Sequence, residues 1–292
     1  MLKQIFKKSY QTALYNPLLW VFGFFSTIFL GNEMTILINQ TNSTLNLVNN
    51  VYIKNLFSFK ENLSSGPNYI IFGLLVYFIL AILVAISAFA QASLISGINK
   101  EKNASFKNCV QKGASFFWLI FLLNIIGLII INVIFVLMGS LLIKATSFET
   151  RLLPLIVFFC ILIGFLINFI IIFLAKFAAF HIVLGKDKFW SSLKKASIFL
   201  GKNWKDCLLI MACILGFSFL FGLIFIIISM GVILPFSILG IISYYFGWGA
   251  FFYGLLMVNF CLIMIMLLIA ISFFTVFQYS VWVYFFKNKV DL

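Results

Sequence analysis

Residues 188–233 read KFWSSLKKASIFLGKNWKDCLLIMACILGFSFLFGLIFIIISMGVI, a lysine-rich segment followed by an apolar run of membrane length. In residues 188–200 the apolar side chains recur at helical intervals, and the lysines fall largely on other faces. That pattern predicts an amphipathic helix, and lysines on the polar face are typical of helices that lie in a membrane interface. The stretch therefore predicts an interfacial helix that leads into a transmembrane helix.

The same order of segments occurs two more times in the chain. Lysine-rich amphipathic segments also start at Leu2–Tyr15 and Ala104–Phe117, and each of the three precedes two apolar runs. We therefore expect three parallel two-span repeats. The expected units are about residues 1–97, 98–185 and 186–292 of a single integral membrane domain, residues 1–292.

Composition excludes a water-soluble protein. Of 292 residues, 64% are apolar and 9% are charged, whereas soluble domains carry about 25% charged residues. The longest stretch without a charge, Cys207–Phe286, has 80 residues. The net charge of +13 does not indicate nucleic acid, because the lysines form short clusters between apolar runs. The expected partners are a bilayer with anionic headgroups and other membrane proteins.

The apolar runs predict an all-α, polytopic helical bundle with six transmembrane helices. The first is expected to be retained rather than cleaved, because no small-x-small cleavage site follows Leu30. The last is too long for an upright span, and we expect it to tilt, to break near Gly254 or to project into the cytosol. The expected spans are about Pro17–Leu30, Tyr69–Ile95, Ser115–Ile143, Leu152–Leu184, Cys207–Ile233 and Ala250–Phe286.

The distribution of lysines predicts the orientation. Fifteen lie before the first span, in the second and fourth connections and after the last span. The opposite side holds Lys54, Lys60, Lys144 and Arg151. By the positive-inside rule both termini are expected to be cytoplasmic, in the cell (inner) membrane. The segment Leu234–Gly249 is expected to be an interfacial loop with an aromatic belt, not a seventh span.

The second, fourth and sixth spans become rich in small or polar residues near their cytoplasmic ends. Ala92, Ala179 and Thr275 are examples. Small residues let helices approach closely in lipid, so these spans are expected to form an inner bundle. The pattern leaves open whether the bundle is simple packing or lines a path. Asparagines within the spans, Asn124 among them, are expected to form interhelical hydrogen bonds.

Four polar residues near these cytoplasmic ends are the candidate site. Gln91 and Gln278 occupy comparable positions, and with His181 and Lys176 they form the expected polar cluster at the mouth of the bundle. For Lys176 the alternative is that its long stem reaches the headgroups. For His181 the alternative is an interfacial role.

No pattern of catalytic or ligand-binding residues is found in the sequence. Paired carboxylates, a Ser-His-Asp set and a phosphate-binding glycine loop are all absent. His181 is the only histidine and has no Cys, Asp or Glu at ligand spacing. We therefore expect no enzyme activity, no catalytic residue, no cofactor and no metal ion.

Residues 16–33, reading NPLLWVFGFFSTIFLGNE, resemble the opening of a group of uncharacterised multi-pass bacterial membrane proteins. The alternation of basic amphipathic helices and spans is also loosely similar to the membrane domain attached to some glycerophosphodiester phosphodiesterases. The resemblance implies a multi-pass membrane fold. It implies no activity, because this chain lacks the catalytic domain of those enzymes.

The sequence leads to two functional hypotheses. The first is a non-enzymatic protein with a structural or accessory role in the membrane. The alternative is a transporter or permease for a small solute or a lipid, which would use the inner bundle. A water-accessible cavity near Gln91 and Gln278 favours transport, whereas a solid apolar centre favours the accessory role.

Overall fold

The computed structural model describes residues 2–27, 68–99, 105–146 and 153–290. Nearly all of these residues are helical, and no strand occurs among them. Five of the described helices, α5 to α9, are long and apolar enough to cross a membrane. The chain is therefore an all-α, multi-pass membrane protein. The helices are α1 (Leu2–Tyr15), α2 (Leu18–Thr27), α5 (Asn68–Asn99), α6 (Phe106–Thr146), α7 (Leu153–Gly185), α8 (Phe189–Tyr245) and α9 (Gly249–Val290).

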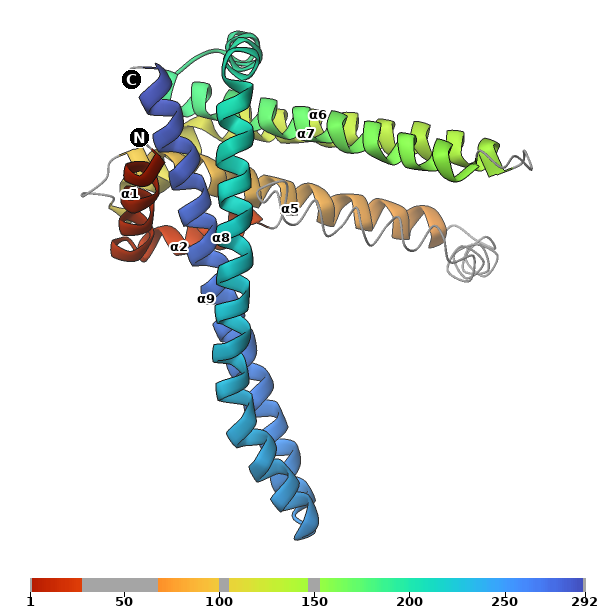
Figure 1. The fold of residues 1–292 in the computed structure, drawn as a ribbon, viewed down its shortest axis with the longest axis vertical. Helices are drawn as coiled ribbons and strands as arrows, with labels where there is room; N and C mark the ends of the chain where they lie inside the picture. Colours follow the sequence, from red (N-terminus) through yellow and green to blue (C-terminus); the bar gives the residue numbers. More distant parts are fainter. Residues whose placement is uncertain (1, 28–67, 100–104, 147–152, 291–292) are drawn as a thin grey trace.

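The molecule consists of a hub from which long helices project (Figure 1). Most buried side chains lie in the hub. An α6–α7 arm (residues 125–146 and 153–167) and an α8–α9 arm (residues 215–245 and 249–271) leave it in different directions, and α5 extends on the same side as α6 and α7. The hub comprises α1, α2 and residues 84–99, 106–124, 168–185, 189–214 and 272–290.

Within the hub the helices form a closed ring. Each helix from α2 to α9 packs against the next one along the chain, and α9 returns to pack against α1 and α2. The two termini therefore lie at the same end of the molecule (Figure 1). Helices α5, α7 and α9 also contact one another, as the expected inner bundle requires.

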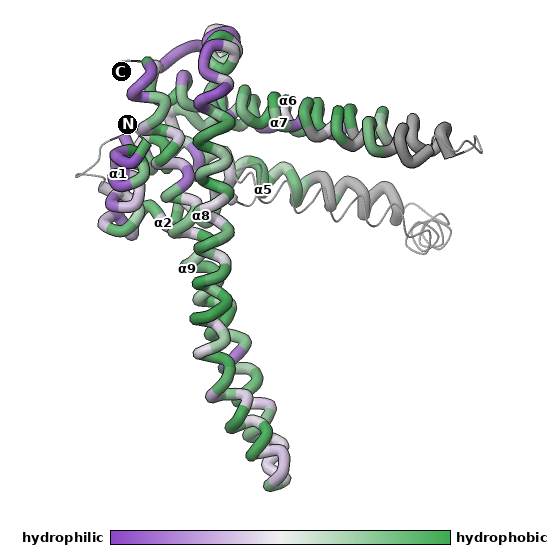
Figure 2. The backbone as a smooth tube through the Cα atoms, in the orientation of Figure 1, coloured by the Kyte–Doolittle hydropathy of each residue, from purple (hydrophilic) through white to green (hydrophobic). Residues whose placement is uncertain are grey.

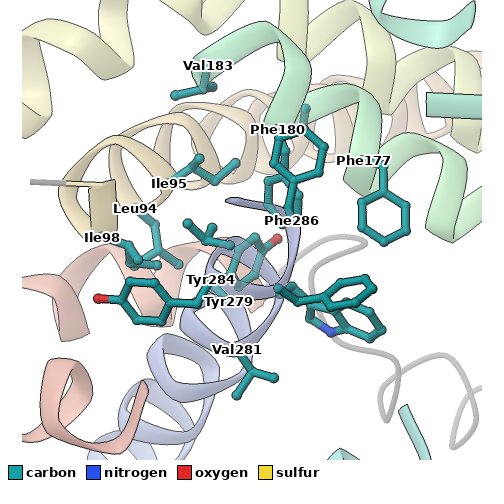
Figure 3. Packing of buried hydrophobic residues seen from close by; sticks show 14 of the residues in the cluster. Leu94, Ile95, Ile98, Phe177, Phe180, Val183, Tyr279, Val281, Tyr284 and Phe286 are labelled. Atoms are coloured by element: carbon teal, nitrogen blue, oxygen red, sulfur yellow. The ribbon is translucent and has the colours of Figure 1, made fainter. Parts of the chain in front are cut away.

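Aromatic side chains fill the centre of the hub. Trp282 is fully buried, and its ring lies edge-on to Phe173 and Phe177, with centroids 5.1 and 5.9 Å apart. Figure 3 shows side chains of α5, α7 and α9 meeting in this core. Edge-to-face aromatic pairs contribute beyond the area that they bury, so these contacts hold α7 against α9.

Small residues let the hub helices approach closely. A Cβ added at Gly23 would lie 2.7 Å from the backbone oxygen of Ser272, so α2 and α9 touch there. The α1 helix is tied to α9 by a hydrogen bond of 2.8 Å between the Thr12 and Tyr284 hydroxyls. The first and last helices of the chain thus close the ring by direct contact.

The three lysine-rich segments differ in how they join their spans. Pro17 separates α1 from α2, because proline has no N–H and suits only the first turn of a helix. The backbone of Asn203 leaves helical geometry (φ −116°, ψ 20°) and kinks α8. The segment Ala104–Phe117 shows no such break: from Phe106 it is the start of α6 itself. The prediction of a separate interfacial helix there is wrong, because neither proline nor a kink interrupts the helix.

The expected loop at Leu234–Gly249 is also wrong for most of its length. Residues 234–245 continue α8 through Pro235, and only residues 246–248 form the turn to α9. In lipid, backbone N–H and C=O groups must form hydrogen bonds within their own segment, and a helix provides these bonds. Pro235 has no N–H and therefore removes only one of them, so the helix continues through it. Likewise α9 does not break at Gly254 but runs unbroken from Gly249 to Val290.

Hydropathy separates the hub from the arms. Hydrophilic residues gather over α1, the connection between α7 and α8, and the C-terminal end of α9, whereas the described arm helices are largely hydrophobic (Figure 2). Arm side chains such as Ile227 and Met257 are 69% and 72% exposed. The expected first span beyond Thr27 lies outside the described residues, as does the loop that follows it.

Candidate functional site

A small cavity lies where α5, α6, α7 and α9 meet, and it contains two of the four expected site residues. Its volume is about 30 Å³, enough for one or two water-sized molecules. Gln91, Asn124, Lys176 and Tyr279 line its polar part. The remaining lining residues are apolar or small: Ile95, Gly127, Ile131, Ile171, Ile172, Ala175 and Ala179.

Gln91 is held by hydrogen bonds from two directions. Its Oε1 accepts from Nδ2 of Asn124 on α6 at 3.3 Å, and its Nε2 donates to Oγ of Ser87 at 3.4 Å. Asn124 therefore forms an interhelical hydrogen bond, as expected from the sequence. Both ends of the Gln91 amide are therefore engaged, one with α6 and one within α5.

Lys176 lies inside the hub. Its side chain is 8% exposed, and its ammonium lies 5.5 Å from the ring centroid of Tyr279 and 5.4 Å from that of Trp282. The alternative that Lys176 reaches out to the headgroups is therefore wrong. Ring faces attract a cation, so the two aromatic residues of α9 stabilise the charge of a lysine on α7.

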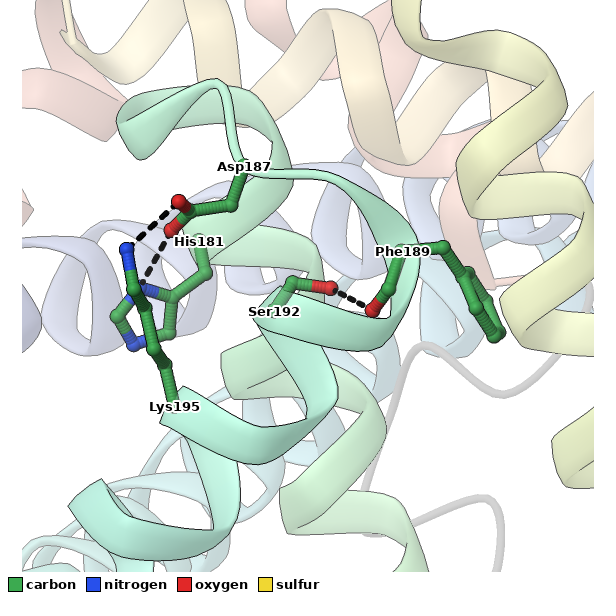
Figure 4. Close-up of polar contacts among 5 residues, drawn as sticks. All are labelled: His181, Asp187, Phe189, Ser192 and Lys195. Atoms are coloured by element: carbon green, nitrogen blue, oxygen red, sulfur yellow. Dashed lines mark hydrogen bonds and ion pairs between the residues drawn. The ribbon is translucent and has the colours of Figure 1, made fainter.

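His181 belongs to a separate polar group at the corner between α7 and α8. Its Nδ1 lies 3.4 Å from Oδ2 of Asp187, and Nζ of Lys195 lies 2.6 Å from Oδ1 of the same carboxylate (Figure 4). The His181 ring is edge-on to Phe286, with centroids 4.8 Å apart. The backbone turns at Lys186, with a positive φ of 53°, and brings Asp187 back onto α7. This group fixes the corner.

Gln278 is buried apart from both groups. Its side chain is 1% exposed, and neither amide atom has a hydrogen-bond partner among the described residues. The structure thus brings Gln91 and Lys176 together at one cavity. His181 lies instead with Asp187 and Lys195. Gln278 belongs to neither group. Tyr279, the neighbour of Gln278, lines the cavity instead, which sequence reasoning missed.

A second hollow of about 190 Å³ lies in the α8–α9 arm. Ser237 and Asn259 are the polar residues among its lining side chains, and the others are apolar or glycine. In the part of the chain that the structure describes, no three His, Cys, Asp or Glu side chains gather where they could hold a metal ion. The hub cavity is taken as the candidate site because Gln91 and Lys176, two of the residues expected from the sequence, line it.

Comparison of the chain with protein-family models, curated proteins and solved structures gives no match. The similarity to bacterial multi-pass proteins and to the membrane domain of glycerophosphodiester phosphodiesterases stays a prediction.

Proposed function

We propose that the chain is a six-span protein of the cell membrane with a structural or accessory role, not an enzyme, and with both termini in the cytoplasm. The observation that carries the proposal is the filled centre of the hub. Phe173, Phe177 and Trp282 occupy the place where the inner helices converge. The cavity beside them has a volume of about 30 Å³, which is enough for one or two water molecules.

The proposal includes three parallel repeats, and two structural correspondences support them. In each lysine-rich segment a pair of small residues four positions apart is buried. These pairs are Ser9 and Ala13, Cys109 and Gly113, and Ser192 and Ala196. Such spacing lets a helix pack closely on its neighbours in lipid.

The second correspondence is in the inner helices. Each of them contains a phenylalanine, Phe89, Phe177 or Phe277, within its buried part. The residue two positions later on each helix lines the hub cavity. These residues are Gln91, Ala179 and Tyr279. Equivalent positions of three repeats would meet in this way around a common axis.

The position of charge supports a hub on the cytoplasmic side. The described lysines lie in the hub or in the α7–α8 connection beside it, with Lys144 near the end of α6 as the exception. Exposed lysines such as Lys188 and Lys194 would then face anionic headgroups.

Because the arms leave the hub in different directions, both can cross one bilayer only if they tilt. At 1.5 Å per residue α9 is about 63 Å long, against about 30 Å for the membrane core.

A transporter is the second candidate, and the polar part of the cavity favours it. Gln91 and Lys176 lie where a path through the inner bundle would pass. A path requires that water reach these positions in some state of the protein.

Cysteine labelling distinguishes the two roles. With the five native cysteines replaced by serine, Gln91→Cys and Gln278→Cys would be tested in the membrane with a small, water-soluble thiol reagent. Ser197→Cys, at an exposed position, is the reactive control, and Ala178→Cys, fully buried, is the unreactive one.

The accessory role predicts that both glutamine positions react as slowly as position 178. Reaction at the rate of position 197 would contradict that role and favour transport. Uniform reactivity at all four positions would show that the hub does not form, which would overturn the proposal itself.

A further inference from the structure

The α8–α9 arm contains a polar side chain whose hydrogen-bonding capacity is not used within the arm. Asn259 lines the hollow of about 190 Å³, and its Oδ1 is buried with no hydrogen-bond partner among the described residues. Two other polar side chains of the arms bond to their own helix: Nδ2 of Asn132 donates to the backbone oxygen of Leu128 at 2.9 Å, and Oγ of Ser243 donates within α8 at 2.8 Å. Ser229, whose Oγ also lacks a partner, is buried and does not line the hollow. The Asn259 amide is thus a polar group at an open hollow that the arm itself does not satisfy.

The depth of the hollow excludes lipid headgroups as its partner. Ser237, the other polar residue of the hollow, lies eight residues before Tyr245 at the end of α8, and Asn259 lies ten residues after Gly249 at the start of α9. At 1.5 Å per residue these positions are about 12 and 15 Å from the tip of the arm. Exposed aromatic side chains at the tip, Tyr245 and Trp248, are typical of the membrane interface. The hollow then lies within the hydrocarbon core of about 30 Å, where acyl chains offer no hydrogen bond.

A second copy of the chain supplies the missing group at the same depth. The distribution of lysines inserts every copy in one orientation, so the Asn259 side chains of two neighbouring copies lie equally far from the membrane surface. A primary amide has both donors and an acceptor, so these two side chains can pair by two N–H···O bonds. Polar side chains form interhelical hydrogen bonds of this kind in lipid. No charge opposes the approach of two arms, because Cys207–Phe286 contains none.

We propose that two copies of the chain associate through their α8–α9 arms, with the Asn259 amides paired across a twofold axis and the two hollows facing each other. Identical surfaces that meet in this way give a closed dimer rather than an open chain of copies. The contact lies on the arm, away from the hub (Figure 1). The inference goes beyond the structural or accessory role and applies equally to a transporter, but it rests on the proposed passage of this arm through the membrane.

Disulfide cross-linking in reconstituted membranes tests the association. In the background without native cysteines, Leu256→Cys places a thiol on the hollow, and Met257→Cys places one at the same depth outside the lining residues. Met257 is 72% exposed and Leu256 is 50% exposed, so random collisions would cross-link position 257 at least as well. The purified full chain would be diluted into phospholipid vesicles and oxidised with copper–phenanthroline. Position 256 is expected to give a covalent dimer, and position 257 is not.

The role of the amide is tested with Leu256→Cys as the parent. Asn259→Leu removes the amide and is expected to lower the cross-linked fraction at least about fivefold, because the interhelical hydrogen bonds are lost. Asn259→Gln keeps an amide and is expected to retain most of the cross-linking. Asn132→Leu, in the α6–α7 arm, is the matched control and is expected to change nothing, because Asn132 bonds within its own helix. All three variants are expected to keep the parent's unfolding midpoint in detergent, since both positions lie outside the hub.

Three outcomes would overturn the proposal. The first is equal cross-linking at positions 256 and 257, and the second is an Asn259→Leu variant that cross-links like its parent. The third is no dimer in vesicles of the purified chain but cross-linking to another protein in native membranes, which would assign the hollow to a different partner. Reaction of position 256 with a membrane-impermeant maleimide would overturn both the association and the proposed orientation, whereas loss of the association alone leaves the proposed role standing.

Discussion

The hub and the arms use the same apolar residue types in opposite ways. In the hub, Trp282 and Phe286 are fully buried and contact several helices. In the arms, Ile227 and Met257 point their side chains outward. Lipid tails are as apolar as these side chains, so the arms gain little from packing against each other. The hub therefore specifies the fold, whereas the arms specify insertion into the membrane.

The largest effect is expected for truncation of the central tryptophan. Trp282→Ala is expected to lower the free energy of unfolding by about 3–5 kcal/mol, because a buried aromatic side chain leaves a cavity. Trp248→Ala, at the tip of the α8–α9 arm and 59% exposed, is the matched control and is expected to change it little. Equilibrium unfolding in mixed detergent micelles measures both, and equal losses would break the distinction between hub and arm.

A smaller effect is expected where two hub helices touch. In Gly23→Ala the new Cβ meets the backbone of Ser272, and overpacking of this kind costs about 1–3 kcal/mol. Gly222→Ala in the α8–α9 arm has open space around it. That variant is expected to keep or slightly raise stability, because alanine favours helix. The same unfolding assay measures both variants. If Gly222→Ala lowered the free energy of unfolding as much as Gly23→Ala, the distinction between the packed hub and the open arm would be wrong.

The smallest effect separates the two glutamines that the sequence grouped together. Gln91→Leu removes the partner of Asn124 and is expected to cost about 0.5–1.5 kcal/mol. Gln278→Leu removes two buried polar atoms without described partners and is expected to be neutral or stabilising. If Gln278→Leu proves the more destabilising of the two, the hub contains a polar partner for Gln278 beyond the described contacts.

The approximate positions of the long helices could be predicted from the sequence. Uncharged runs of membrane length form helices in lipid, because a helix satisfies its own backbone hydrogen bonds. Pro17 also marked the start of α2. The kink at Asn203 had no comparable signal. The helix at residues 234–245 was missed because Pro235 and the aromatic residues are typical of loops in water, a solvent that the arms do not face.

The candidate site was only partly predictable. Helices such as α5, α7 and α9 are apolar nearly all round, so periodicity does not fix which face points inward. Gln91 and Lys176 could therefore be proposed as site residues, but their meeting, and the exclusion of Gln278, required the structure. The small pairs of the three lysine-rich segments were present in the sequence. Their burial required the structure, because the sequence alone does not show which face of each segment packs against the hub.

The hub and the tips of the arms are expected to lie on opposite sides of the membrane. In the background without native cysteines, Tyr245→Cys at the tip of the α8–α9 arm and Ser197→Cys in the hub would be treated with a membrane-impermeant maleimide. We predict that position 245 is labelled in intact cells and that position 197 is labelled only after the membrane is opened. Labelling of both positions in intact cells, or of position 197 alone, would contradict a cytoplasmic hub with arms that cross the membrane.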